Sequence, residues 1–268
     1  MILLFYAFAR EIAPFKRRLR DRAPLDLDGL HGFLATIGGK QFAVVGHGIG
    51  HKRATETARR AFDLMPGAEL VIGTGVVGAL SSGLKPGDLV LADRVLTNHA
   101  DNENKVTEQV TAIGDAQLQA IGRSLASAGI AYSTGAILTS NRVFTVAEKR
   151  RAKESTGAIA VDMETAAIAA EAAARGLPFI AIRAVLDQVD DEVVGAGLAD
   201  EDGNVRPLAA TTFLLRNPAA MLQLPRMMRN LSRATAAIAD GLIAIAHEGK
   251  VPAATKRARD PVPKKRRH

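Results

Sequence analysis

Short apolar runs alternate along the chain with segments that carry an apolar residue at every third or fourth position. The apolar runs, bounded by Gly, Pro and polar residues, predict strands near 2–8, 33–37, 41–46, 69–74, 88–96, 132–138, 158–162 and 178–186. The periodic segments predict helices near 10–21, 52–64, 115–128, 146–154 and 163–175. From about 206 to 247, three prolines interrupt a helical pattern and predict several short helices. We therefore expect an α/β fold, a three-layer sandwich with a central mixed sheet flanked by helices, plus a helical C-terminal region.

The glycines of GTGVVG at 73–78 satisfy the dinucleotide-binding pattern G-x-G-x-x-G and follow a predicted strand. That pattern requires a helix directly after the glycines, because the helix N-terminus binds the pyrophosphate. Only ALSSGLKPG follows before Asp88, and its two glycines and one proline exclude a helix of useful length. We interpret Gly75 and Gly78 as positions where the backbone approaches a ligand or the sheet bends. A nicotinamide-dependent oxidoreductase is kept as a lower alternative.

The composition favours one large domain over residues 1–249. At 268 residues with 47% hydrophobic content, the chain lies near the upper length that one core supports. It has no cysteine, which excludes disulfides, iron–sulfur clusters and thiol nucleophiles and removes the usual ligands of structural zinc. The opening MILLFYAFAR is too short for a membrane span and lacks the features of a signal peptide. We expect a cytoplasmic enzyme that uses no metal and no organic cofactor.

The net charge of +7 is concentrated at one end of the chain. Residues 250–268 carry eight Lys or Arg and one Asp, so this segment accounts for the whole excess and the rest of the chain is neutral. Rich in Pro and charge, it is predicted to be a disordered basic tail. The tail either keeps the protein soluble or binds an anionic surface, such as the inner membrane in a peripheral contact. A membrane or nucleic-acid binder is a second function class, although no specific nucleic acid is expected.

Two acids, Asp162 and Glu164, stand where an apolar stretch turns into an alanine-rich helix, in VDMETAAIA at 161–169. Asp is a good N-cap, and acids in the first turn are favourable at the positive end of a helix dipole, so stabilisation of the helix start explains both residues. The alternative is that one of them carries chemistry. These nine residues alone support the two interpretations about equally.

Four segments, taken together and in this order, resemble the superfamily of purine nucleoside phosphorylases and methylthioadenosine/S-adenosylhomocysteine nucleosidases. They are AFAREI at 7–12, GHGIGHKRA at 46–54, VIGTGVVGALSSGLKPGDLVLAD at 71–93, and AVDMETAAIA at 160–169 followed by RAVLDQVDD at 183–191. The helical region after 206 is similar to the subgroup of hopanoid-associated phosphorylases, which act on an adenosyl lipid. The resemblance implies cleavage of the N-glycosidic bond of an adenosine derivative, with a small-molecule or lipid-linked nucleoside as substrate, and a homo-oligomer. The alternative is a phosphorylase of soluble purine nucleosides.

The resemblance also assigns the catalytic acids. Asp187 becomes the general acid that protonates N7 of the purine; a loop-starting Asp is the alternative. Glu11 becomes the residue that activates the attacking water, although an acid in the first turn of a helix is favourable anyway. Glu164 becomes the acceptor for the ribose hydroxyls, which leaves the capping role to Asp162.

Further positions of this sequence match the family's substrate pocket. Met163 would lie against the sugar, and Phe144 against the purine, although core packing explains either side chain. Ile49 and the backbone at Gly48 would line the sugar and its 5′ substituent. The glycine segment would contribute Gly75, Val76 and Gly78.

The sequence departs from the phosphorylases at the phosphate site. Gly73 and Val76 stand where those enzymes present an Arg and a Ser or Thr, so the side chains favour water over phosphate as the nucleophile. Backbone amides and the basic residues of the second segment could still bind an anion, so inorganic phosphate is kept as a co-substrate alternative; those residues are His47, His51, Lys52 and Arg53. Leu186 replaces a Ser that often precedes the catalytic Asp.

Overall fold

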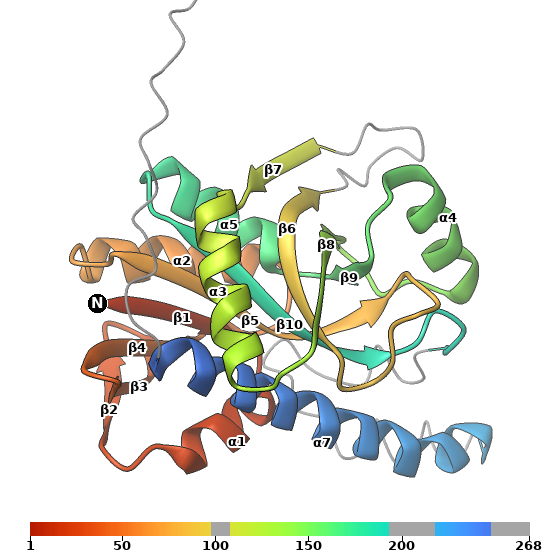
Figure 1. Ribbon diagram of the computed structural model, residues 1–268, viewed down its shortest axis with the longest axis horizontal. Helices are drawn as coiled ribbons and strands as arrows, with labels where there is room; N and C mark the ends of the chain where they lie inside the picture. The colour runs from red at the N-terminus through yellow and green to blue at the C-terminus, as the bar shows by residue number, and fades with distance from the viewer. Residues whose placement is uncertain (98–107, 193–217, 248–268) are drawn as a thin grey trace, which may run out of the picture.

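The computed structural model describes residues 1–97, 108–192 and 218–247 (Figure 1). Four parallel strands form the centre of its sheet: β1 (Ile2–Tyr6), β4 (Lys40–Gly46), β5 (Leu70–Ala79) and β10 (Phe179–Asp187). Their side chains are almost all buried, which suits strands covered on both faces. Because the strands are parallel, their carboxyl ends meet at one edge of the sheet.

The remaining strands close one side of the sheet and extend the other. β5 and β10 are joined into a ring of hydrogen-bonded strands by β6 (Leu89–Thr97), β8 (Tyr132–Thr139) and β9 (Ala160–Asp162), while β7 (Glu108–Ala112) pairs with β6. On the other side β4 continues into β3 (Leu30–Ile37) and β2 (Arg22–Leu27) through antiparallel hairpins. Parallel and antiparallel pairs together make a mixed sheet, as expected.

Helices cover both faces of the sheet. α1 (Ala9–Arg18), α3 (Asp115–Ser127) and α7 (Pro218–His247) pack with one cluster of core residues, and α2 (His51–Leu64) and α5 (Thr165–Ala174) pack with another. In Figure 1, α1 and α7 lie below the sheet and α2 and α5 above it. α4 (Val146–Thr156) joins a smaller cluster beside β8 and β9. The three-layer α/β sandwich is therefore confirmed.

Two strands were not predicted. β2 has the sequence RAPLDL, with only Leu25 buried, so its apolar pattern is too weak to indicate a strand. It forms because Asp28 and Gly29 adopt positive φ of 47° and 77° in a tight turn that pairs β2 with β3. The Asp-Gly pair is the sequence signal for such a hairpin. β7 is held by its pairing with β6.

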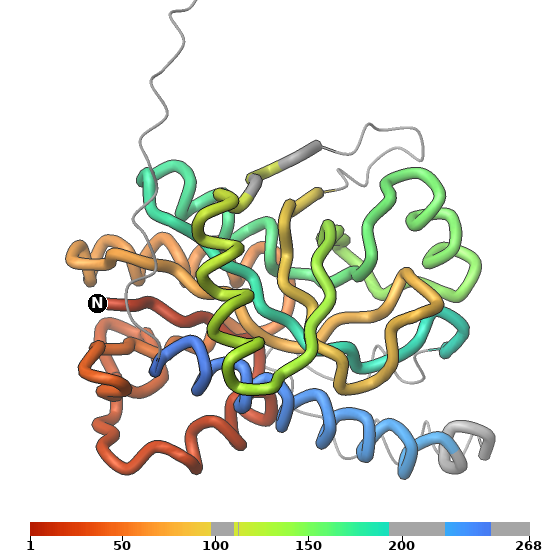
Figure 2. Tube along the Cα trace, viewed as in Figure 1, coloured from red at the N-terminus to blue at the C-terminus, as the bar shows by residue number. Residues whose placement is uncertain are grey.

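The C-terminal region differs from the series of short helices that its prolines predict. It is one helix, α7, from Pro218 to His247, shown in the blue end of the trace in Figure 2. Pro218 is its first residue, where no backbone hydrogen bond is lost, and Pro225 removes one bond from a helix whose later residues pack on the sheet. Residues 206–217 and the predicted basic tail at 250–268 lie outside the described residues.

The glycine segment does not form a dinucleotide site. β5 runs through Gly73, Gly75 and Gly78 without a break, and no helix follows them before β6. Gly75 and Gly78 pair with Arg183 and Asp187 of the neighbouring strand β10. Within the described parts of the chain, no helix has the length and apolar character needed to cross a membrane.

Candidate active site

Two of the acids predicted to carry the chemistry, Glu11 and Asp187, lie where the parallel strands β1 and β10 end, and the third, Glu164, follows β9, which runs antiparallel to β5. Glu11 is in α1, which follows β1; Glu164 directly precedes α5, which follows β9; and Asp187 ends β10. Ligand groups in open α/β sheets gather at the carboxyl edge of the sheet, because the loops there converge from several strands. The topology therefore brings together residues that are far apart in the sequence.

Glu11 serves both the helix start and strand β5. Its Oε2 accepts hydrogen bonds from the backbone amides of Ala7 and Phe8, at 2.8 and 3.2 Å, at the beginning of α1. Its Oε1 accepts a hydrogen bond from the amide of Val76 at 2.9 Å. The carboxyl is buried, and burial raises its pKa, whereas these amides and the nearby Arg183 oppose the rise. Capping the start of α1 is therefore part of the role of Glu11, but its side chain also faces the edge of the sheet.

Gly75 and Gly78 leave space for these charged groups. A Cβ on Gly75 would lie 2.5 Å from Nη1 of Arg183 and 2.7 Å from Oε1 of Glu11, and its φ of 141° disfavours any other residue. A Cβ on Gly78 would lie 3.1 Å from Oδ2 of Asp187. Charged side chains thus approach the backbone at the two glycines. Close approach to a ligand there stays a prediction.

Glu164 is held by the turn that precedes α2. Gly48 and Gly50 have φ of 76° and 101°, and this turn directs the Gly50 amide to Oε1 of Glu164 at 2.8 Å. Burial, followed by the negative charge of Asp162, raises the pKa of Glu164 to about 8. At neutral pH the Glu164 carboxyl is therefore mainly protonated when no ligand is bound.

Arg183 is a fully buried cation, and no role for it was predicted from the sequence. Its Nη2 lies 3.0 Å from Oδ2 of Asp162, its Nη1 donates to the carbonyl of Thr74 at 2.6 Å, and its Nε and Nη2 donate to Oγ1 of Thr165. The signal was present as an Arg within the apolar strand FIAIRAV. A buried guanidinium needs such partners, because its charge is costly to remove from water.

Asp162 supplies a side-chain contact at the start of α5, although the N-cap position itself is Glu164, whose side chain makes no capping hydrogen bond. The Asp162 carboxylate accepts the amide of Thr165, the first residue of α5, at 3.2 Å, and the hydroxyl of Thr139 at 2.8 Å. Because Asp162 also pairs with Arg183, the contact is part of a buried polar network. The two acids of VDMETAAIA therefore have different partners: Asp162 bonds the start of the helix, and Glu164 faces the turn at Gly50.

Asp187 is directed by a bulge in β10. The register with β5 shifts between Val185 and Asp187, so Leu186 is an extra residue and the following side chain is turned. Oδ2 of Asp187 accepts a hydrogen bond from Nζ of Lys149 at 2.5 Å, and Lys149 is buried. Burial raises the pKa of Asp187, and the charge of Lys149 opposes that rise. Lys149 was not singled out from the sequence.

The remaining predicted residues, Met163, Ile49 and Phe144, are apolar and lie near the acids or in the core. Met163 and Ile49 are partly buried, beside Asp162 and in the Gly48 turn respectively. Phe144 is 8% exposed and packs with Leu80, Leu138 and Val161. These are the contacts of a core side chain, which was the alternative interpretation, so stacking of Phe144 on a purine stays a prediction.

Two buried polar atoms lack a hydrogen-bond partner among the described residues. They are Nε2 of His47 and Oγ1 of Thr74. Nδ1 of His47 lies 2.6 Å from the carbonyl of Gly48, so Nδ1 carries the proton and Nε2 is an acceptor. Burial lowers the pKa of His47 to about 3, so the imidazole is neutral at neutral pH.

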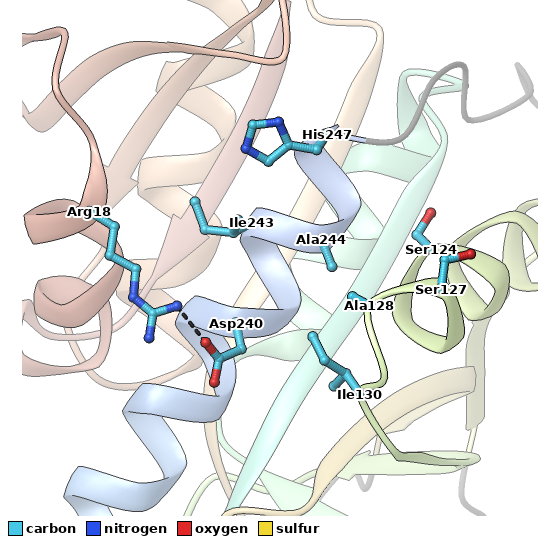
Figure 3. Close-up of a pocket in the computed structure, with 9 residues that line it drawn as sticks. All are labelled: Arg18, Ser124, Ser127, Ala128, Ile130, Asp240, Ile243, Ala244 and His247. Carbon is cyan, nitrogen blue, oxygen red and sulfur yellow. Dashed lines mark hydrogen bonds and ion pairs between the residues drawn. The ribbon is translucent and has the colours of Figure 1, made fainter.

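A surface hollow lies apart from these acids. Figure 3 shows it between the ends of α1, α3 and α7, with Nη1 of Arg18 bonded to Oδ1 of Asp240 at 2.5 Å and His247 nearby. None of the predicted site residues lines it. Across residues 1–97, 108–192 and 218–247, no group of three His, Asp or Glu side chains is arranged to hold a metal ion.

The fold and the site define a class of enzyme, the purine nucleosidases and nucleoside phosphorylases. A family model described as the phosphorylase superfamily matches residues 2–215, and the chain belongs to this superfamily. The 5′-methylthioadenosine/S-adenosylhomocysteine nucleosidase of Haemophilus influenzae (strain PittEE) is 27% identical over 203 residues, 69% of this chain and 84% of the relative. The enzyme of the same name from Actinobacillus succinogenes is 27% identical over 222 residues, 76% of this chain and 90% of the relative.

Solved structures agree on the fold. The nucleosidase of the same name from Campylobacter jejuni superposes with a TM-score of 0.70 at 18% identity, covering 92% of this chain and 98% of that one. Futalosine hydrolase of Helicobacter pylori superposes with a TM-score of 0.68 at 20% identity, covering 91% and 96%. At these identities the likeness concerns the fold alone.

Gly75→Ala is expected to destabilise the protein by about 1–3 kcal/mol, because the new methyl group would displace Arg183 or Glu11. Gly83→Ala is the matched control, since a Cβ there meets nothing within 4 Å. Thermal unfolding of the two variants and the parent protein measures the difference. Equal unfolding midpoints for both variants would contradict the close approach at Gly75.

Glu164 is expected to make the protein less stable as the pH rises. Its pKa is 4.5 as a free side chain and about 8 in the folded state, so between these values the folded protein binds the extra proton. Its contribution is fully present below pH 4.5 and is lost as the pH rises through about 8, at up to about 1.4 kcal/mol per pH unit. Glu164→Gln should flatten this part of the pH dependence, and a midpoint difference that is constant across the range would refute the assignment.

Proposed function

We propose that this enzyme hydrolyses the N-glycosidic bond of an adenosine derivative and releases adenine. The reaction needs a proton donor for the departing base, a group that stabilises the ribosyl cation, and a base that activates water on the far face of the sugar. In this proposal Asp187, Glu164 and Glu11 take these three roles.

The observation that carries the proposal is the position of Glu11. Its carboxylate is buried beside Arg183 and is held by three backbone amides, two on Oε2 and one on Oε1. Oε1 therefore keeps a lone pair for a water molecule. Since burial raises the pKa of this carboxyl, Glu11 is a stronger base than an exposed glutamate and suits proton abstraction near neutral pH.

Water is favoured over phosphate because, among the described residues, the backbone amides and the buried cation next to these acids are already occupied. The amides of Val76 and Gly50 donate to Glu11 and Glu164 rather than facing an anion. His47 is neutral, and the side chains of His51 and Lys52 are exposed. The cation Arg183 already pairs with Asp162. A phosphate dianion would therefore enter a region with more acids than free cations.

The positions of Asp187 and Glu11 suit opposite ends of a nucleoside. Gly75, beside Glu11, and Gly78, beside Asp187, are three residues apart on β5, or about 10 Å along the strand. That length accommodates a ribose and a purine. Oε1 of Glu164 accepts from Gly50, which leaves Oε2 to accept from a ribose hydroxyl. In this proposal Glu164 is the carboxylate when it stabilises the ribosyl cation.

The substrate class follows from the relatives and from the resemblance. The curated relatives are named for 5′-methylthioadenosine and S-adenosylhomocysteine, both 5′-substituted adenosines. The similarity of the region after 206 to the hopanoid-associated subgroup extends the proposal to a hydrophobic, lipid-linked 5′ substituent such as that of adenosylhopane. A phosphorylase of soluble purine nucleosides is the second candidate.

Asp187→Asn is expected to reduce turnover by about 100-fold or more, since an amide cannot donate the proton that the base requires. Release of adenine from 5′-methylthioadenosine and from an adenosine with a 5′-alkyl chain measures it, with circular dichroism as the check on folding. Asp190→Asn is the matched control, because Asp190 is exposed and pairs only with Arg150 among its described contacts. Full turnover in Asp187→Asn would show that another group is the acid.

The nucleophile is tested by running the same reaction with and without inorganic phosphate. The expected products are adenine and the free sugar, at a rate that phosphate does not change, because the buried cations Arg183 and Lys149 already pair with Asp162 and Asp187. Chromatography distinguishes the free sugar from the sugar 1-phosphate. Accumulation of the 1-phosphate, or a dependence of the rate on phosphate, would establish the phosphorylase instead.

A further inference from the structure

Lys149 is a buried ammonium group in a helix whose other charged residues reach solvent or the protein surface. It lies in α4, and its side chain is 1% exposed. All three of its protons have acceptors: Oδ2 of Asp187 at 2.5 Å, the carbonyl of Gln188 at 2.9 Å and the carbonyl of Asp191 at 2.8 Å. A fully satisfied ammonium of this kind keeps its positive charge in the interior.

The three acceptors belong to one short segment, residues 187–191. Lys149 thus joins α4 to the turn that begins at Asp187 and fixes the carboxyl together with the backbone that follows it. Oδ2 of Asp187 receives the Lys149 hydrogen bond and must act as an acceptor, so a proton on this carboxyl belongs to Oδ1. The contact therefore determines which oxygen is free to meet a ligand.

We propose that Lys149 is a positioning residue for the general acid: it holds Oδ2 of Asp187 and stabilises the carboxylate that remains when the proton leaves Oδ1. This inference rests on the proposed function. In the step, the Oδ1–H bond of Asp187 breaks and the N7–H bond of the purine forms, while the electrons of the C1′–N9 bond pass to the base. Water bonds to C1′ and gives its proton to Glu11. Lys149 remains protonated throughout.

The ammonium charge acts on the transition state more than on the bound substrate. Negative charge develops on Asp187 only as its proton moves to the base, and a fixed cation at 2.5 Å stabilises that charge without reorganisation. Removing the cation should make Asp187 a weaker acid. Catalysis by a general acid is lost as the pH rises through the pKa of the acid, so this loss should move to higher pH when Lys149 is replaced.

Lys149→Met is expected to lower kcat with little change in KM, and to move the alkaline limb of the kcat/KM profile upward by about 1 to 3 pH units. Lys149→Gln keeps a neutral hydrogen-bond donor and should show the same shift, whereas Lys149→Arg keeps the charge and should restore the limb toward its original position. The substrate is 5′-methylthioadenosine, with released adenine as the readout.

Arg150→Met is the matched control. Arg150 is the next residue of the same helix and pairs with Asp190 of the same turn, at 2.7 Å, but both side chains are exposed. It should leave the limb and kcat unchanged. A limb that stays in place in both Lys149→Met and Lys149→Gln, with folded protein confirmed by circular dichroism, overturns the inference and makes Lys149 a structural contact only. Turnover that survives in Asp187→Asn overturns instead the assignment of the acid in the proposed function.

Discussion

The ion pair between Arg183 and Asp162 is the interaction on which the site depends. Both side chains are 1% exposed, and the same guanidinium bonds the carbonyl of Thr74 and the hydroxyl of Thr165. One cation therefore connects β5, β9, α5 and β10 at the carboxyl edge of the sheet. Because a buried charge without its partner costs about 3–5 kcal/mol, these elements are constrained to one arrangement.

The glycines of strand β5 leave room for the charged side chains of the site. Gly75 lets Arg183 and Glu11 approach the backbone, and Gly78 does the same for Asp187. Glu11 and Glu164 are removed from water, which raises the pKa of both carboxyl groups, and the negative charge of Asp162 adds to the rise for Glu164. The fold thus supplies carboxyl groups that can hold or accept protons near neutral pH, which is what acid–base chemistry on a glycosidic bond requires.

Glu11 and Asp187 have different electrostatic surroundings. Glu11 is beside Arg183 and the backbone of β5, whereas Asp187 is turned by the bulge at Leu186 toward the buried Lys149. Asp187 therefore pairs with its own cation, whereas Glu11 is held by backbone amides beside a cation that pairs with Asp162. Such separate environments allow similar carboxyl groups to act in different protonation states.

The sequence by itself determined the alternation of strands and helices and the absence of a helix after GTGVVG. These features depend on local periodicity and turn chemistry, which short stretches of sequence express. Only the tertiary structure decided that β2 is a strand, that Phe144 packs in the core, and that Arg183 and Lys149 are the buried cations. The reason is physical: the energetic cost of burying each cation is offset only by a partner 21 or 38 residues away in the sequence, and no local pattern encodes such a partner.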